Sequence, residues 1–217
     1  MIKYDFTCVF CWYFIGSPII KYMAKVKGLS KRVAKEKLKK EYKAMLNKTE
    51  DIKDSPLRFN LIWGCLLLSV VKAFDNVSYE EFDKCLRFQF QNKILLKNMR
   101  KNFNVFKSKI KFDKPYESNL KNDWEYSIDI SKFPYEQTTS FKRCGLHSLC
   151  KQEDMLEYLP YMCKLDYIMY TKQGCELIRT KALSNGYNSC IFRFINSEFS
   201  DVRVIMDEEG IKGEDLI

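Results

Sequence analysis

Apolar residues recur at helical spacing in the first half of the chain and alternate with polar residues in the second half. Within residues 31–46 they return every three or four positions behind Ser30, whose hydroxyl can cap a helix start. This pattern predicts an amphipathic helix with a strongly basic outer face. Beyond Pro56, leucines and a cysteine at the same spacing predict a second helix, nearly all apolar and therefore central, with proline at its first position.

A third helix is predicted by Ser78 and Glu81, which together form the pattern of a capping box. In this motif each side chain accepts a hydrogen bond from a backbone amide at the helix start. We expect the helix to continue in broken form to about Phe106. Residues 107–121 are rich in lysine and contain Pro115, so we interpret them as a connector.

The apolar run at residues 6–20 resembles a short signal or anchor segment. A single lysine, Lys3, precedes it, the acidic Asp5 lies beside it, and no cleavage site of small residues follows. A run of 15 residues is also shorter than the ~20 residues that span a bilayer. We therefore expect a buried N-terminal element.

From Trp124 onward the alternation is that of half-buried strands. It predicts an α+β protein in which a helical N-terminal half, residues 1–121, packs on a small antiparallel β-β-α-β-β half, residues 122–217, within one compact domain. The single helix predicted in this C-terminal half has Pro160 early in it and ends at Gly174. A tight turn at Asn185-Gly186 joins the last two strands. The predicted elements are strands over Trp124–Ile130 and Thr138–Cys144, a helix from about Asp154 through Tyr170, strands over Cys175–Leu183 and Ser189–Ile195, and a final apolar run over Val202–Met206.

Charge is distributed unevenly along the chain. Residues 1–121 carry a net charge of +14, and residues 122–217 carry −5. Such asymmetry can mark an arm that binds nucleic acid or a membrane. Because arginine is scarce and no nucleic-acid motif is present, we favour solvated helix surfaces and expect neither partner. A role for the helix at 30–46 on a nucleic acid or membrane surface stays open, as does the oligomeric state.

The cysteines do not form the pattern of a disulfide framework, because their number, nine, is odd and their spacing is irregular. Reduced thiols and a cytoplasmic location are the expectation. Cys8 and Cys11 could form a redox pair, but they lie among bulky aromatic residues. Together with Cys65 and Cys85 they are more typical of small buried apolar side chains.

Candidate chemistry concentrates in residues 141–166. One alternative is a zinc or other divalent metal site at Cys144, His147, Cys150 and Cys163. The spacing does not match paired metal-binding knuckles, and on a strand His147 would face away from the two nearest cysteines. We therefore expect no cofactor. The chain also has no glycine-rich phosphate loop, no G-x-S-x-G and no H-E-x-x-H motif, so nucleotide binding, serine hydrolase and zinc protease chemistry have no support.

Cys163 and Asp166 are three residues apart on a predicted helix and therefore share a face. A carboxyl group beside a thiol can accept or deliver a proton while the thiol attacks carbon. Because a carboxylate alone would raise the pKa of the thiol, a cation such as Arg179 or Arg143 would be needed nearby. His147 could also serve, although a lone histidine is more often a hydrogen-bonded structural residue.

Four segments, in order, resemble the L-2-amino-thiazoline-4-carboxylic acid hydrolase family over roughly residues 120–195. The departure from the family pattern is Ile191, which stands where the family commonly has aspartate. The segments are Trp124 to Ile130, Phe141-Lys-Arg-Cys144, Leu159-Pro160-Tyr-Met-Cys163-Lys-Leu-Asp166, and Arg179-Thr180 to Gly186 leading into Cys190-Ile-Phe192-Arg193-Phe194.

The resemblance implies hydrolysis of a carbon–nitrogen bond, other than a peptide bond, in a small cyclic substrate of the amidine or isothiourea type. Under this hypothesis Cys163 attacks the ring carbon, Asp166 moves protons, and Cys144 is a second thiol at the site. The alternative is a domain of the same fold, with a weak likeness to vinyl reductase domains, that binds a small ligand or a partner chain without catalysis. The candidate substrate-binding residues are Arg179, which could pair with a substrate carboxylate, His147, Arg143 and Cys190.

Overall fold

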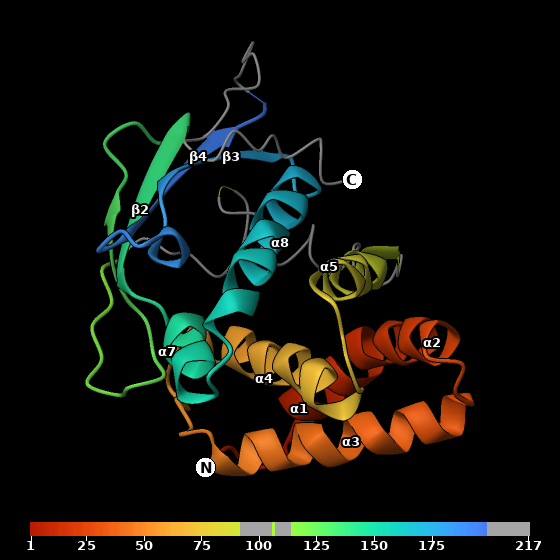
Figure 1. Cartoon of the computed structure of the whole chain (residues 1–217). Helices are drawn as coiled ribbons and strands as arrows, with labels where there is room; N and C mark the ends of the chain where they lie inside the picture. The colour runs from red at the N-terminus through yellow and green to blue at the C-terminus, as the bar shows by residue number, and fades with distance from the viewer. Residues whose placement is uncertain (92–105, 107–113, 199–217) are drawn as a thin grey trace. The chain divides into compact units, whose positions relative to one another are not determined.

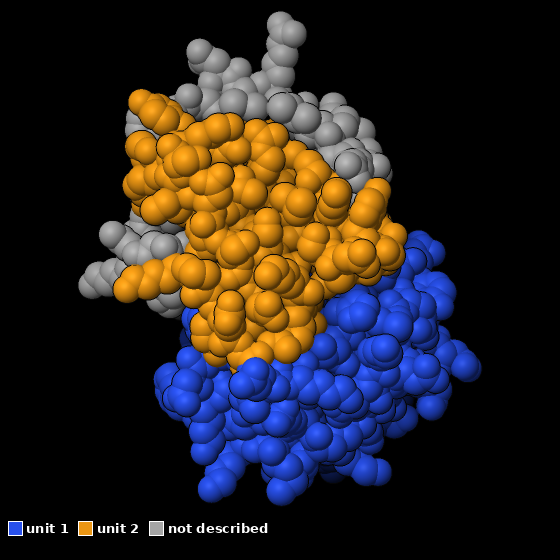
Figure 2. All heavy atoms as spheres, turned by 90° about the vertical axis from the view of Figure 1, so that its left-hand side faces the viewer, with its two compact units in different colours: residues 1–95, 119–123, 145–162 blue, residues 96–118, 124–144, 163–217 orange. Residues whose placement is uncertain are grey.

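A helical N-terminal half and a four-stranded antiparallel sheet in the C-terminal part confirm the α+β class (Figure 1). The structure, a computed structural model, describes residues 1–91, 106 and 114–198. Figure 2 colours the two units into which the chain divides. Unit 1 comprises residues 1–95, 119–123 and 145–162, and unit 2 comprises residues 96–118, 124–144 and 163–217.

The expected N-terminal element is a helix over Phe6–Val26, longer than the apolar run in the sequence. Asp5 starts it, accepting a hydrogen bond from the backbone amide of Cys8 at 3.1 Å. The helix continues through Pro18 because a π-helical turn precedes it, so that the proline lies in a first turn, where a missing amide costs little. By length and composition this helix could cross a membrane. Its parts are α1 (Phe6–Cys11), the π-turn Trp12–Gly16 and α2 (Ser17–Val26).

The next three helices follow the sequence prediction closely. Ser30 caps α3, accepting from the amide of Val33, and both hydrogen bonds of the Ser78–Glu81 capping box are present at the start of α5. The predicted start of α4 was wrong by two residues, because Ser55–Leu57 forms a turn and leaves Pro56 outside the helix. The predicted continuation toward Phe106 falls on residues 92–105, outside those described. The bounds are α3 (Lys31–Lys48), α4 (Arg58–Ala73), α5 (Tyr79–Phe88) and the 3₁₀ turn Gln89–Gln91.

Helix α4 is the centre of unit 1, and nearly all its side chains are buried, as its apolar sequence predicts. Helix α7 (Gly145–Gln152), which the strand interpretation of this region did not anticipate, packs on it. Gly64 permits this close approach, since a Cβ built there would lie 2.3 Å from Cδ2 of Leu146. The bare glycine backbone of α4 therefore forms part of the contact surface for α7.

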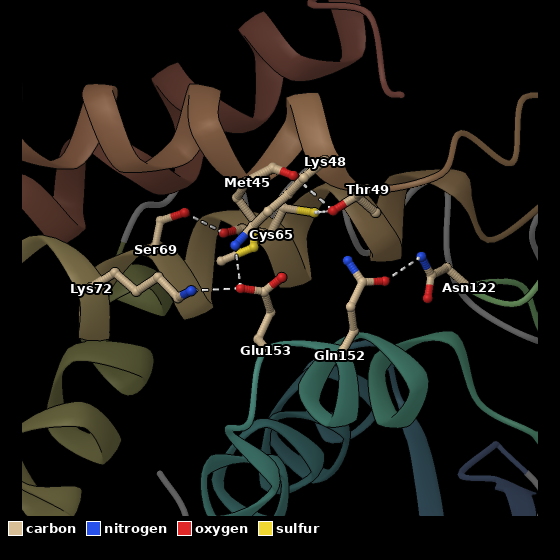
Figure 3. Close-up of polar contacts among 9 residues, drawn as sticks. All are labelled: Met45, Lys48, Thr49, Cys65, Ser69, Lys72, Asn122, Gln152 and Glu153. Atoms are coloured by element: carbon tan, nitrogen blue, oxygen red, sulfur yellow. Dashed lines mark hydrogen bonds and ion pairs between the residues drawn. The ribbon is translucent and has the colours of Figure 1, made fainter.

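Glu153, directly after α7, connects the end of this helix with α3 and α4 through two ion pairs (Figure 3). Its side chain is only 3% exposed, and its Oε2 accepts from Lys48 of α3 at 2.5 Å and from Lys72 of α4 at 2.6 Å. Burial raises the pKa of this carboxyl group, but the hydrogen bonds and charges of the two lysines together lower it by more, and the net shift is downward. Beside it, Gln152 accepts from the amide of Asn122 at 3.3 Å.

Unit 2 contains an antiparallel sheet with the strand order β1-β2-β4-β3. Gly186, in the left-handed region at φ 85°, helps to close the connection between β3 and β4, where the sequence predicted a tight turn. In the register of the sheet, Arg179 of the edge strand β3 lies opposite Phe192, and Cys190 lies opposite Phe141. The strands are β1 (Glu125–Asp129), β2 (Glu136–Arg143), β3 (Cys175–Lys181) and β4 (Cys190–Asn196).

Helix α8 (Leu159–Thr171) follows a 3₁₀ turn at Leu156–Tyr158, so it begins later than the sequence predicted. From Cys163 onward its residues belong to unit 2 and cover one face of the sheet. The rings of Tyr170 and Phe194 lie 4.7 Å apart across this contact. The covered face is lined by buried or half-buried side chains from all four strands, among them Tyr126, Phe141, Leu177, Phe192 and Phe194.

Candidate active site

Three polar side chains predicted from the sequence lie together in unit 2. Cys163 and Asp166 project from consecutive turns of α8, and Arg179 projects from β3 on the face that α8 covers. Nη1 of Arg179 lies 4.0 Å from Oδ2 of Asp166 and donates to the carbonyl oxygen of Cys163 at 3.2 Å. The helix thus supplies a thiol and a carboxyl group, and the strand supplies the cation that faces them.

The Cys163 thiol is protonated at neutral pH. Burial raises its pKa to about 12, and the charge of Arg179 lowers it by a smaller amount. Asp166 and Cys190 raise it further, while a hydrogen bond with the Ser184 side chain lowers it. A nucleophilic role for this sulfur therefore requires a base that removes its proton as the new bond forms.

Asp166 is suited to move that proton. Burial raises its pKa to about 7, with the guanidinium of Arg179 opposing the rise. Its side chain is nevertheless 29% exposed, so solvent reaches the carboxyl group. Both protonation states are populated near neutral pH, which is the condition under which one group serves as base and then as acid.

Arg179 is buried, and its guanidinium contacts other groups of the protein. Its guanidinium stacks on the rings of Tyr167 and Phe192, at 5.1 Å and 5.8 Å from their centres. With Asp166 and the Cys163 carbonyl as further neighbours, the guanidinium is held in one position relative to α8. The sequence did not point to Tyr167, Phe192 or Ser184 as neighbours of the site. Tyr167 follows Asp166 directly, but the other two depend on strand register and turn geometry.

The side chains of Cys190 and Ile191 lie on opposite faces of the sheet. Cys190 lies on the face that α8 covers, where its sulfur accepts from the amide of Leu183 at 3.2 Å. Since side chains alternate along a strand, Ile191 points to the opposite face together with Arg193. An aspartate at position 191 would also project away from Cys163. The departure from the family pattern at Ile191 thus leaves the Cys163 side of the sheet unchanged.

The remaining candidates are Arg143, Cys144 and His147. Arg143 donates to the carbonyl oxygen of Ser118 and lies 3.9 Å from Glu125. Cys144, half-buried, links β2 to α7. His147 lies on α7 in unit 1, where burial and, to a smaller extent, Lys151 lower its pKa, so it is neutral at pH 7.

The metal alternative gains no support. Within the described residues, no group of three or more histidine, cysteine, aspartate or glutamate side chains is arranged to hold a metal ion. Cys150, one of the four residues named for it, is buried in α7.

A thiol, a carboxyl group that titrates near neutrality and a buried guanidinium on an α+β framework define a candidate site for nucleophilic hydrolysis. The family model described as L-2-amino-thiazoline-4-carboxylic acid hydrolase matches residues 68–194, more than half of the chain. The protein belongs to this family, which confirms the resemblance and indicates a hydrolase-like function at the family level. Searches of curated proteins and of solved structures returned no match.

Proposed function

We propose that this protein opens a carbon–nitrogen bond in a small cyclic substrate of the amidine or isothiourea type, with Cys163 as nucleophile and Asp166 as proton carrier. The observation that carries the proposal is the joint placement of Cys163, Asp166 and Arg179 on α8 and β3. Family membership supports the reaction class. The natural setting we propose is the cytoplasm, with a small molecule as partner.

The proposed reaction has two stages. In the first, Sγ of Cys163 adds to the ring carbon between the heteroatoms while the Asp166 carboxylate takes the thiol proton. Asp166 then returns this proton to the ring nitrogen as the carbon–nitrogen bond breaks, leaving the opened substrate bonded to sulfur. In the second stage Asp166 removes a proton from water, the oxygen adds to the same carbon, and the sulfur leaves and recovers its proton.

The electrostatics of the site suit this sequence of transfers. A thiol whose pKa is about 12 is a poor nucleophile until its proton moves, and a carboxyl group with a pKa of about 7 can accept and return a proton at neutral pH. Arg179, which opposes the rise in the pKa of Asp166, keeps part of that carboxyl group ionised. In this proposal Arg179 acts on Asp166 and on the position of α8. Cys144 stays a candidate second thiol at the site, and Arg143, His147 and Cys190 stay candidates for contacts with substrate.

Activity assays on L-2-amino-thiazoline-4-carboxylic acid and ring analogues test the proposal. Cys163→Ala and Asp166→Asn should each lower kcat/KM by about a thousandfold or more, because each removes a group that takes part in bond making. The matched controls are Cys175→Ala, at the far end of β3 from Arg179, and Asp154→Asn, exposed and with a positive φ that asparagine tolerates. Both controls should retain most of the parent activity.

Folded Cys163→Ala and Asp166→Asn variants that turn over substrate at the parent rate would remove the proposed roles. Binding of the ring compounds by the parent protein without any turnover would instead favour the non-catalytic ligand-binding alternative.

A further inference from the structure

The helix Phe6–Val26 has two different faces. Its inner face, with Cys11, Ile15, Ile19 and Met23, is buried in the core of unit 1. Although the helix is long and apolar enough to cross a membrane, only 44% of its most apolar stretch is buried. Insertion across a bilayer would pull the inner face out of the core. The outer face of the helix is therefore the part that can contact a membrane while the inner face stays in the core.

The outer face is aromatic. Phe6 is 82% exposed and Tyr13 is 62% exposed, and helical spacing places both on the same side as the partly buried Phe10 and Phe14. The rings of Phe10 and Phe14 lie 4.4 Å apart, so the rings form a connected strip. We call this strip, with the exposed side chains before it, the aromatic face. Its members are Met1, Tyr4, Phe6, Phe10, Tyr13 and Phe14.

Cations border the aromatic face. Along the same helix it continues into the exposed Lys21 and Lys25. Helix α3, which packs beside α2 (Figure 1), presents a basic outer surface. Nζ of Lys43 on α3 lies 5.7 Å from the centre of the Tyr4 ring, so basic and aromatic surfaces meet there. The exposed cations of α3 are Lys31, Arg32, Lys35, Lys37, Lys39, Lys40, Lys43 and Lys48, of which Arg32, Lys37 and Lys48 pair with Glu36, Asp75 and Glu153.

We propose that the aromatic face and the basic surface of α3 dock unit 1 onto an anionic membrane surface. Aromatic side chains are favourable at the depth of lipid headgroups, where a ring can be apolar on one side and hydrated on the other. Lysine side chains bury their methylene stems and reach the headgroups with their ammonium groups. Anionic lipids attract such a surface, and charge complementarity is the reason for assigning lipid as the occupant. This proposal replaces the sequence expectation of no membrane partner and is independent of the hydrolase proposal.

Cosedimentation of the full chain with lipid vesicles tests the docking. We expect binding to vesicles of phosphatidylcholine mixed with phosphatidylserine, and much weaker binding to phosphatidylcholine alone. Because two exposed rings would leave water on docking, the double variant Phe6→Ser, Tyr13→Ser should lower the binding constant by about tenfold or more. The control Tyr187→Ser removes a ring that is 44% exposed in unit 2 and should bind as the parent does.

The basic surface is tested separately by Lys35→Gln, Lys39→Gln in one chain, which should weaken binding to the anionic vesicles, as should added salt. Circular dichroism checks that every variant is folded. Absence of vesicle binding by the parent, or equal binding by the aromatic double variant, would overturn the proposal. So would sedimentation showing that the aromatic face joins two copies of the chain in place of lipid.

Discussion

At the scale of single residues, the raised pKa of Asp166 lowers the free energy of unfolding at neutral pH. A carboxyl group in water has a pKa near 3.8, whereas burial raises that of Asp166 to about 7. Between these values the folded protein holds a proton that the unfolded chain releases. The contribution of Asp166 to stability therefore falls as pH rises from about 4 to about 7, and stays low above that. A group placed for proton transfer thus weakens the fold at the pH where it works.

The first prediction concerns the stability of Asp166→Asn. Asparagine carries no charge, so this variant should unfold at a higher temperature than the parent at pH 8. The expected increase is about 2 °C or more, corresponding to about 1 kcal/mol for a chain of this size. The difference should shrink as pH falls and vanish near pH 4. Thermal unfolding followed by circular dichroism at several pH values measures it, and a difference that does not vary with pH would contradict the raised pKa.

Sequence reasoning reached the site residues unevenly. Cys163 and Asp166 were paired correctly as sharing a helix face, because i and i+3 is a local relation that any helix imposes. Arg179 was named as a nearby cation, but its burial between Tyr167 and Phe192 depends on how β3 pairs with β4. The unit to which His147 belongs also depends on tertiary structure. Long-range packing, unlike local spacing, leaves little trace in one sequence.

At the scale of elements, Gly64 of α4 has no side-chain carbon, and this allows α7 to pack closely against it. The second prediction is that Gly64→Ala destabilises the protein by about 1–3 kcal/mol, because the new methyl group would overlap Leu146 of α7. Leu146→Ala in the same chain should recover part of this loss by removing the clash. Urea denaturation of both single variants and the double variant gives the coupling energy. Additive effects of the two substitutions would show that α7 does not approach α4 at this point.

The third prediction concerns the ion pairs that connect α3, α4 and the end of α7. Glu153→Gln should cost about 1–3 kcal/mol at pH 7, less than for fully buried partners, because Lys48 and Lys72 stay partly exposed to water. Since the folded pKa of Glu153 is lowered, its contribution is present above pH 4.5 and is lost as pH falls through the folded pKa. Urea denaturation at pH 7 and at low pH measures this.

The matched control for that measurement is Glu157→Gln, the same chemical change at an exposed residue four positions further along the chain. It should alter stability little at either pH. A similar loss in both variants would mean that the lysine contacts of Glu153 contribute nothing specific.

Elements were predictable where their ends carry local signals. Ser30 and Ser78 marked helix starts correctly, because capping is a contact between residues three apart. Pro56 misled the prediction, since a turn before α4 leaves this proline outside the helix. Helix α7 lacks a clear cap in the sequence, and so its short span between a strand and α8 was missed.

At the scale of the whole molecule, the chain passes between the two units several times. Helix α7 and the start of α8, up to Met162, belong to unit 1, although they lie in the sequence among the strands of unit 2. The boundary that charge and pattern suggested, between residues 121 and 122, also falls within the segment Asn119–Asp123 of unit 1. A cut there removes from unit 1 the helix that covers Gly64.

The last prediction is that residues 122–217 expressed alone do not form a folded protein. Leu149 and Cys150 of α7 are fully buried in the whole chain, and Leu149 and Met162 pack near Gly64 of α4. Without α4 these apolar side chains would be exposed to water, which costs about 1.5–3 kcal/mol for each large one, a large part of a typical net stability. Amide resonances of the fragment should be poorly dispersed in a two-dimensional NMR spectrum, against well-dispersed resonances for the full chain. A fragment with dispersed resonances and cooperative unfolding would show instead that the sheet and α8 fold without the helices of unit 1.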